Sequence, residues 1–312
     1  SFGFIYHLLQ HCGNPSVLYF FITIVSHPDY TSTHKWLHEM GFIDYLIREL
    51  SLINYNYVSK DANPYFDEIY EKVYSLYRIL SYCKSNPVFL SDLNCRNLIE
   101  IFSKSFKNEP VFVENTRWKM ILKFTTKEAS FMMLSLVPYA ISLLERDDLR
   151  LHEYVVSAID MINLMMSFSQ RAVELVFKSK TLLIIMNLAN HFKNSSILLD
   201  SFQKFVEAAL KFPDLTVQTL VTILLPFVLK EAENRENKVI SPFCIRILEL
   251  LVELGNKNRK IGQIIDFQDG CREFLNGEYL KYKKILNADY GKDDSKSRSE
   301  NGNDTDDMLY WL

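Results

Sequence analysis

Residues 148–168 read DLRLHEYVVSAIDMINLMMSF, and this stretch decides the fold class. Its apolar side chains recur about every 3.6 residues, which is the period of an α-helix with one buried face. The residues that carry this period are Val155, Val156, Ile159, Ile162 and Met166. No glycine or proline interrupts the run, so the stretch predicts one long helix.

The same pattern extends in both directions and is broken only by short connections. Towards the C-terminus it predicts helices over 128–145, 148–168, 170–178, 180–192, 196–212, 214–231, 241–254 and 267–286. Helices of this length with short connections are typical of antiparallel pairs stacked side by side. The predicted fold is therefore all-α, an irregular HEAT/armadillo-like helical-repeat solenoid without a repeat motif of fixed length.

Changes in composition predict four segments. We expect N-terminal helical repeats over 1–106, an irregular hinge or loop over 107–127, and C-terminal helical repeats over 128–287. Residues 288–307 contain seven acidic and three basic side chains and almost no apolar ones. Such a segment buries too little surface to offset its ordering entropy. We therefore expect a disordered acidic tail over 288–312, whose apolar end is either a segment that folds back or a short binding motif.

Composition also restricts the partners. The 312 residues carry a formal net charge of -3, which does not suggest a nucleic-acid partner. The longest near-apolar run, Val17–Val25, is far shorter than the roughly 20 residues that span a bilayer. The five cysteines form no CxxC pair, as in reduced cytoplasmic or nuclear proteins.

A search for catalytic chemistry finds no motif that supports an enzyme. The sequence contains no HExxH, no GxSxG, no glycine-rich phosphate loop and no kinase motif. His7 and His11, and likewise His34 and His38, are four residues apart and could share a helix face. Neither pair has a third ligand at a suitable spacing. We expect no metal, no cofactor and no catalytic activity.

A polar stripe interrupts the apolar helix over 148–168. Asp160 and Asn163 lie there, with Glu153, Ser157 and Ser167 on roughly the same face. Such a stripe suits the solvent-facing wall of a solenoid. Two interpretations stay open, a contact with a partner or a passively exposed face.

A tryptophan begins the second informative stretch, residues 36–51, WLHEMGFIDYLIRELS. Trp36 is either a core residue that bridges two helices or an exposed anchor of an interface, a role in which tryptophan is enriched. His38 and Glu39 are further candidates for contacts with a partner.

This stretch resembles the SAPS-domain family, whose members are regulatory subunits of protein phosphatase 6 and Sit-type Ser/Thr phosphatases. The family pattern is roughly W-L-x-E-x-x-L-I-x-x-L-I-x-L-L-S. The residues that match are Trp36, Leu37, Glu39, Ile43, Leu46, Ile47, Leu50 and Ser51. Upstream, residues 8–17, LLQHCGNPSV, are similar to the family's L-L-x-H-x-G-x-P-x-[VI].

The resemblance is good over residues 4–52 and weaker up to about residue 291. Cys244 and Cys271, for example, stand where the family has His and Trp. The resemblance implies a scaffold that binds a Ser/Thr phosphatase catalytic subunit of the protein phosphatase 6 type, directs it to substrates and joins further adaptor subunits. The alternative is a generic helical-repeat adaptor for transport or complex assembly.

Overall fold

The structure is a computed structural model that describes residues 2–53, 66–93, 96–104, 109–146, 150–234, 237–268 and 270–286. Every element in these ranges is helical, which confirms the predicted all-α fold class. The chain divides into two compact units, Ser1–Asp269 and Gly270–Leu312. This division differs from the expected segments, which placed a break at 107–127. The predicted tail over 288–312 lies outside the described residues.

The first half of unit Ser1–Asp269 contains seven α-helices and two short 3₁₀ turns among its described residues. They are α1 Phe2–Gln10, α2 Pro15–Ser26, η1 Pro28–Tyr30, α3 Thr31–Glu39, α4 Phe42–Leu52, α5 Phe66–Cys83, η2 Pro87–Phe89, α6 Arg96–Ser103 and α7 Val111–Phe124. The amide of Asn14 begins α2, because its Oδ1 accepts from the Ser16 backbone N–H at 2.9 Å. Gly41 ends α3 in the left-handed region with φ 71°.

The second half continues the same alternation. Its elements are α8 Ser130–Met133, η3 Leu134–Leu136, α9 Val137–Leu144, α10 Glu153–Phe168, α11 Gln170–Lys178, α12 Thr181–His191, α13 Ser196–Ala209, α14 Pro213–Thr219, the π-helical turn η4 Leu220–Leu224, α15 Leu225–Glu233, α16 Ile240–Lys257 and α17 Arg259–Asp266. Unit Gly270–Leu312 contributes α18 Cys271–Asn276 and α19 Glu278–Leu286. The predicted helix over 267–286 is thus two helices separated by Gly277.

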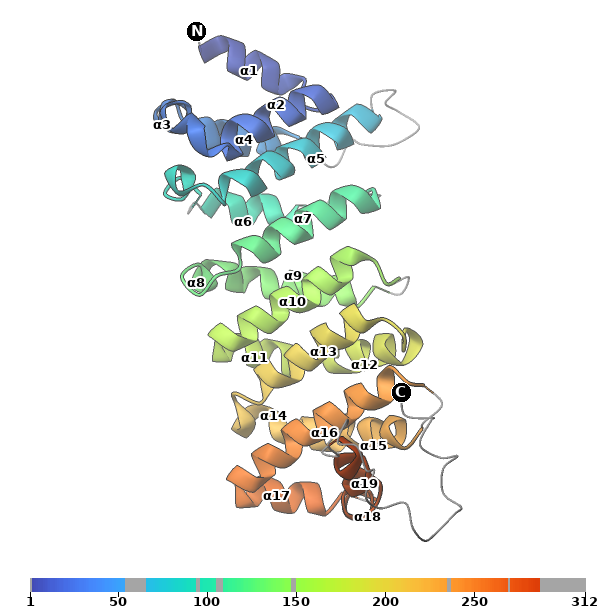
Figure 1. Cartoon of the computed structure of the whole chain (residues 1–312). Helices are drawn as coiled ribbons and strands as arrows, with labels where there is room; N and C mark the ends of the chain where they lie inside the picture. The colour runs from blue at the N-terminus through green and yellow to red at the C-terminus, as the bar shows by residue number, and fades with distance from the viewer. Residues whose placement is uncertain are drawn as a thin grey trace, which may run out of the picture. The chain divides into compact units, whose positions relative to one another are not determined.

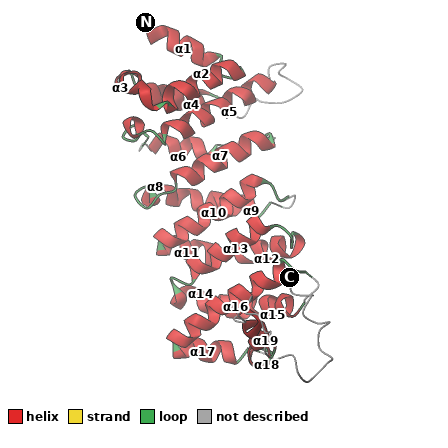
Figure 2. Cartoon of the chain, viewed as in Figure 1, coloured by secondary structure: helices red, strands yellow, loops and turns green. Residues whose placement is uncertain are grey.

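Within unit Ser1–Asp269 the helices form two layers (Figures 1 and 2). One row consists of α2, α5, α7, α10, α13 and α16, each packed against the next. The second layer contains α4, α6, α9, α11, α12, α14 and α15. Stacked helix pairs of this kind bury a continuous core between the layers. This arrangement is compatible with the predicted helical-repeat solenoid.

α10, the helix whose sequence pattern predicted the fold class, buries its apolar face as expected. Of the five apolar residues that carry its period, only Val156 is half-buried and the other four are fully buried. Each such side chain contributes about 1.5–3 kcal/mol by burial. α10 packs against α7 on one side and α13 on the other, so it lies in the middle of the row.

The prediction of an irregular hinge or loop over 107–127 is wrong for most of that stretch, because Val111–Phe124 forms α7. Sequence periodicity missed this helix for a physical reason. It buries two charged residues, Glu114 and Arg117, while Val111 and Phe112 are exposed. Because charged residues are buried and apolar residues are exposed, α7 lacks the single apolar face from which helices were predicted.

A second difference concerns the longest apolar helix. α14, η4 and α15 run continuously over Pro213–Glu233, and this helix is long and apolar enough to cross a membrane by length and composition. The sequence predicted a helix over 214–231 at this place, but the search for uninterrupted apolar residues singled out only Val17–Val25. More than half of this segment is buried, and α15 packs closely against α16, as expected of a core helix.

Candidate partner-binding surface

An aromatic stripe lies on the outer face of α2. The helix directs Phe21 and Val25 into the core. Tyr19, Phe20 and Ile24 lie on another face of α2, with Ser16 and Thr23 beside them. Spacings of three and four residues place these side chains on one side of the helix. Together with η1 and the start of α3 they line a groove of about 550 Å³, formed by Ser16, Tyr19, Phe20, Thr23, Ile24, Tyr30 and Thr33.

Two further exposed apolar side chains, Trp36 and Met40, follow the groove lining along α3. Trp36 is one helical turn beyond Thr33 and its side chain is 40% exposed, as is that of Met40. Tyr19 is 72% exposed. The interpretation of Trp36 as a core residue is therefore wrong, and the neighbouring Leu37 fills the core instead. We call this set the aromatic surface: Tyr19, Phe20, Tyr30, Trp36 and Met40.

Buried polar contacts hold α3 against α2. The imidazole of His34 is buried, and its two nitrogens lie 2.8 Å from the Ile24 carbonyl oxygen and 3.1 Å from Nδ2 of Asn86. Because the Asn86 amide donates to Nδ1, the Nε2–H of a neutral imidazole donates to Ile24. The same amide donates to the Val25 carbonyl at 2.9 Å. These bonds fix the orientation of the aromatic surface.

The other two predicted contact residues of α3 lie beside Trp36. Nδ1 of His38 is 2.6 Å from a carboxylate oxygen of Asp92, which links α3 to the turn after η2. Glu39 is exposed, as is Lys35. The structure therefore brings Trp36 and Glu39 to one surface, with His38 half-buried at its edge.

Asp160 and Asn163 do not belong to this surface. They lie on α10, and α5 and α7 separate α10 from α2 in the row. Asn163 is buried and its Nδ2 donates to the Ser201 carbonyl of α13 at 2.8 Å. Burial raises the pKa of the half-buried Asp160. The stripe therefore includes packing contacts with α13, and the prediction of a solvent-facing wall is wrong for Asn163 and for the buried Ser157.

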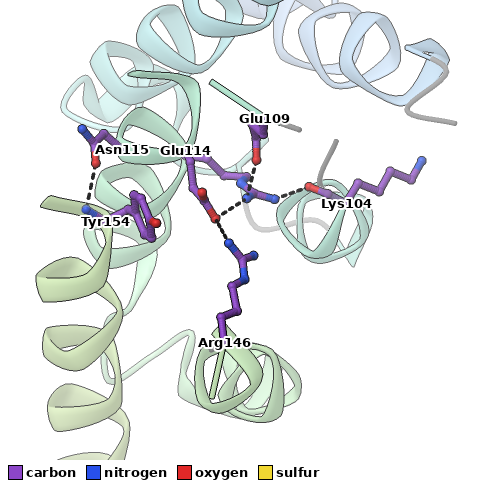
Figure 3. Close-up of polar contacts among 7 residues, drawn as sticks. Lys104, Glu109, Glu114, Asn115, Arg146 and Tyr154 are labelled. Carbon is purple, nitrogen blue, oxygen red and sulfur yellow. Dashed lines mark hydrogen bonds and ion pairs between the residues drawn. The ribbon is translucent and has the colours of Figure 1, made fainter. Parts of the chain in front are cut away.

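A buried charge cluster surrounds Arg117 on α7, and the sequence analysis missed it. The guanidinium is fully buried and donates to a carboxylate oxygen of Glu109 at 2.6 Å and to the Lys104 carbonyl. Glu114 lies 3.6 Å from Arg117 and also accepts from Arg146, at 3.2 Å. Figure 3 shows Glu109 and Arg146 reaching this cluster from different segments, with Asn115 bound to the Tyr154 backbone N–H beside it.

The electrostatics of this cluster indicate a structural role. Burial raises the pKa of Glu109 to about 7, although Arg117 favours its charged form. Burial opposes the charge of Arg117, but the neighbouring groups, Glu109 foremost, outweigh it and raise the pKa of Arg117, so the guanidinium stays charged. Trp118 stacks on Tyr139 at 5.5 Å next to the cluster. Since Arg117 is inaccessible, the cluster joins the end of α6, the start of α7 and the end of α9 rather than binding a ligand.

The residues considered for catalysis or metal binding do not converge. The rings of His7 and His11 meet edge to face at 5.3 Å, and His34 is engaged by backbone and amide groups. Among the described residues, no group of three His, Cys, Asp or Glu side chains could hold a metal. Burial raises the pKa of the Cys12 thiol to about 12, so it is not an activated nucleophile.

The fold and the aromatic surface together describe a helical-repeat protein with an exposed apolar face. Comparison with known protein families finds no family model that matches the chain, and no curated protein is significantly similar to it in sequence. The SAPS-domain resemblance stays a prediction that depends on two short blocks of residues.

Proposed function

We propose that this chain is a non-catalytic scaffold that binds a Ser/Thr protein phosphatase catalytic subunit of the protein phosphatase 6 type and directs it to substrates. The observation that carries the proposal is the exposure of Trp36. This residue begins the block that resembles the SAPS domain, and its exposed part is accessible to a partner.

The physical basis is the use of a few aromatic anchors. Tryptophan and tyrosine dominate binding energy at protein interfaces because they bury a large area with few rotatable bonds. Tyr19 and Phe20 line the groove from α2 and Tyr30 lines it from η1, while Trp36 is exposed farther along α3. Exposed apolar surface of this kind marks interaction sites on folded domains.

A generic adaptor for transport or complex assembly is the second candidate. It is favoured by the residues that depart from the family pattern, such as Cys244 and Cys271, both of which are buried. The aromatic surface would serve such an adaptor equally well, so the two candidates differ only in the partner that it binds.

The experiment that distinguishes them uses the tagged chain and the purified phosphatase catalytic subunit. We expect the wild type to retain the catalytic subunit and Trp36→Ala to lose most of it. Phe131→Ala is the matched control, because Phe131 is an exposed aromatic on α8. The proposal is wrong if the wild type retains no catalytic subunit. A different partner, recovered from cells and lost with Trp36→Ala, would support the adaptor.

A further inference from the structure

A second groove lies between α5 and α7, and its lining differs from that of the aromatic surface. It has a volume of about 530 Å³ and reaches Glu153 at the start of α10. Three aromatic side chains, Tyr74, Tyr82 and Phe112, form part of its wall. Tyr74 and Phe112 meet edge to face at 5.6 Å across the two helices.

The groove carries a local excess of positive charge. It is lined by three cationic side chains and one carboxylate, an excess of two positive charges, on a chain whose net charge is -3. Lys119 pairs with that carboxylate, Glu153, at 2.6 Å. The other two cations, Arg78 and Lys123, have no carboxylate within ion-pair distance among the described residues.

Two tyrosines hold the Arg78 side chain in place. Its guanidinium lies over the rings of Tyr74 and Tyr82, at 5.6 and 5.9 Å from their centroids, and donates to the Tyr74 hydroxyl at 2.6 Å. A guanidinium has five N–H donors in a planar fork that matches a carboxylate. Because the tyrosines already restrict the side chain, binding an anion costs little further ordering entropy.

Lys123 and Asn115 complete the polar lining on α7. The Lys123 ammonium donates to the backbone carbonyl and the hydroxyl of Ser81 on α5, so it also keeps a fixed position. The Oδ1 of Asn115 accepts from the Tyr154 backbone N–H at 2.8 Å. The Nδ2 of Asn115 is therefore the atom that remains for a ligand carbonyl.

Acidic side chains also lie on the row of helices beyond the groove. Glu68 and Glu71 lie on the first turns of α5, and Asp160 and Asp200 lie further along the row on α10 and α13. A nucleic acid running along the row would meet these carboxylates. A short acidic segment would meet only the cations, and its apolar side chains could pack on Tyr82 and Phe112.

We propose that the groove between α5 and α7 binds a short acidic peptide segment of a partner protein, with Arg78 and Lys123 pairing its carboxylates. This proposal does not depend on the identity of the partner at the aromatic surface. It gives the chain a second, charge-selective binding site on the row of helices that α2 begins.

The test is fluorescence anisotropy of the full chain with a fluorescein-labelled Glu-rich peptide that contains one tyrosine. We expect saturable binding that weakens as salt is added, and no binding of the counterpart in which Gln replaces each Glu. The double variant Arg78→Gln, Lys123→Gln should weaken binding about tenfold or more, since it removes two charge-assisted contacts.

The control removes the same kinds of charge from the same row outside the groove. Lys204→Gln with Arg246→Gln, on α13 and α16, should leave peptide affinity unchanged. If the groove variant loses helicity by circular dichroism, Lys119→Glu tests the same prediction at an exposed position. The proposal is overturned by equal binding of the Gln peptide, by equal loss in the control, or by tighter binding of a single-stranded RNA.

Discussion

Replacing Arg117 with methionine should strongly destabilise unit Ser1–Asp269, and the structure sets the size of the effect. The substitution removes a fully buried cation and keeps a side chain of similar length, so the cavity contribution is small. Glu114 keeps Arg146 at 3.2 Å, whereas Glu109, only 3% exposed, has no other described cation within ion-pair distance. One buried carboxylate is then uncompensated, which costs about 3–5 kcal/mol.

The cost should depend on pH in a defined direction. The pKa of Glu109 is already raised to about 7 by burial, and removing Arg117 raises it further. Near pH 5 the folded variant holds Glu109 protonated, so no buried charge is left and the cost is smaller. Near pH 8 the variant must either bury the charge or bind a proton against the solvent pH, so the cost is larger.

Urea denaturation followed by circular dichroism and tryptophan fluorescence measures this effect, because Trp118 stacks on Tyr139 beside the cluster. Arg146→Met is the matched control. It removes the other cation of the cluster, which is 39% exposed, and should cost less than about 1 kcal/mol. The reasoning is refuted if Arg117→Met costs no more than Arg146→Met, or if its cost is the same at pH 5 and pH 8.

Three further substitutions should change the free energy of unfolding. The folded-state pKa of Glu109 lies above that of an unfolded glutamate, so its contribution to stability is full below about pH 4 and is lost as the pH rises through 7. The wild type should therefore lose about 1–3 kcal/mol of its free energy of unfolding relative to Glu109→Gln as the pH rises from 4 to 8. Parallel pH profiles of the two proteins in urea denaturation would contradict this pKa of Glu109. Asn163→Ala should cost about 0.5–1.5 kcal/mol in urea denaturation, because it removes the hydrogen bond from the Asn163 amide to the Ser201 carbonyl, and no change would show that this bond does not stabilise the fold. Gly41→Ala should lower the free energy of unfolding by about 1–2 kcal/mol, measured by thermal denaturation, because its φ of 71° strains any side chain.

The sequence predicted the helices whose polarity follows their burial and failed where the two disagree. α10 and α11 were located because their apolar residues face the core at helical spacing. α7 was missed because Glu114 and Arg117 occupy core positions, and only the three-dimensional arrangement brings Glu109 and Arg146 close enough to compensate them. No local pattern encodes such a cluster.

The sequence also predicted only part of the candidate partner-binding surface. Trp36 and Glu39 were singled out from the sequence, and both are exposed on α3. Tyr19 and Phe20 were not, because a run of apolar residues on α2 shows no difference between a face that packs and one that does not. The polar stripe of Asp160 and Asn163 predicted exposure to solvent, which is wrong for Asn163. A buried amide that binds a carbonyl cannot be told from an exposed amide in the sequence.

α7 connects the buried cluster to the proposed peptide groove. Arg117 faces the core, whereas Asn115, Lys119 and Lys123 line the groove. All side chains of one helix turn together when the helix rotates about its axis. The contacts of Arg117 with Glu109 and the Lys104 carbonyl therefore also determine where the groove residues point. If this coupling holds, Arg117→Met weakens binding of the Glu-rich peptide without touching it, and Arg146→Met does so to a smaller degree. Unchanged peptide affinity in a folded Arg117→Met variant would show that packing against α5 and α10 alone orients α7.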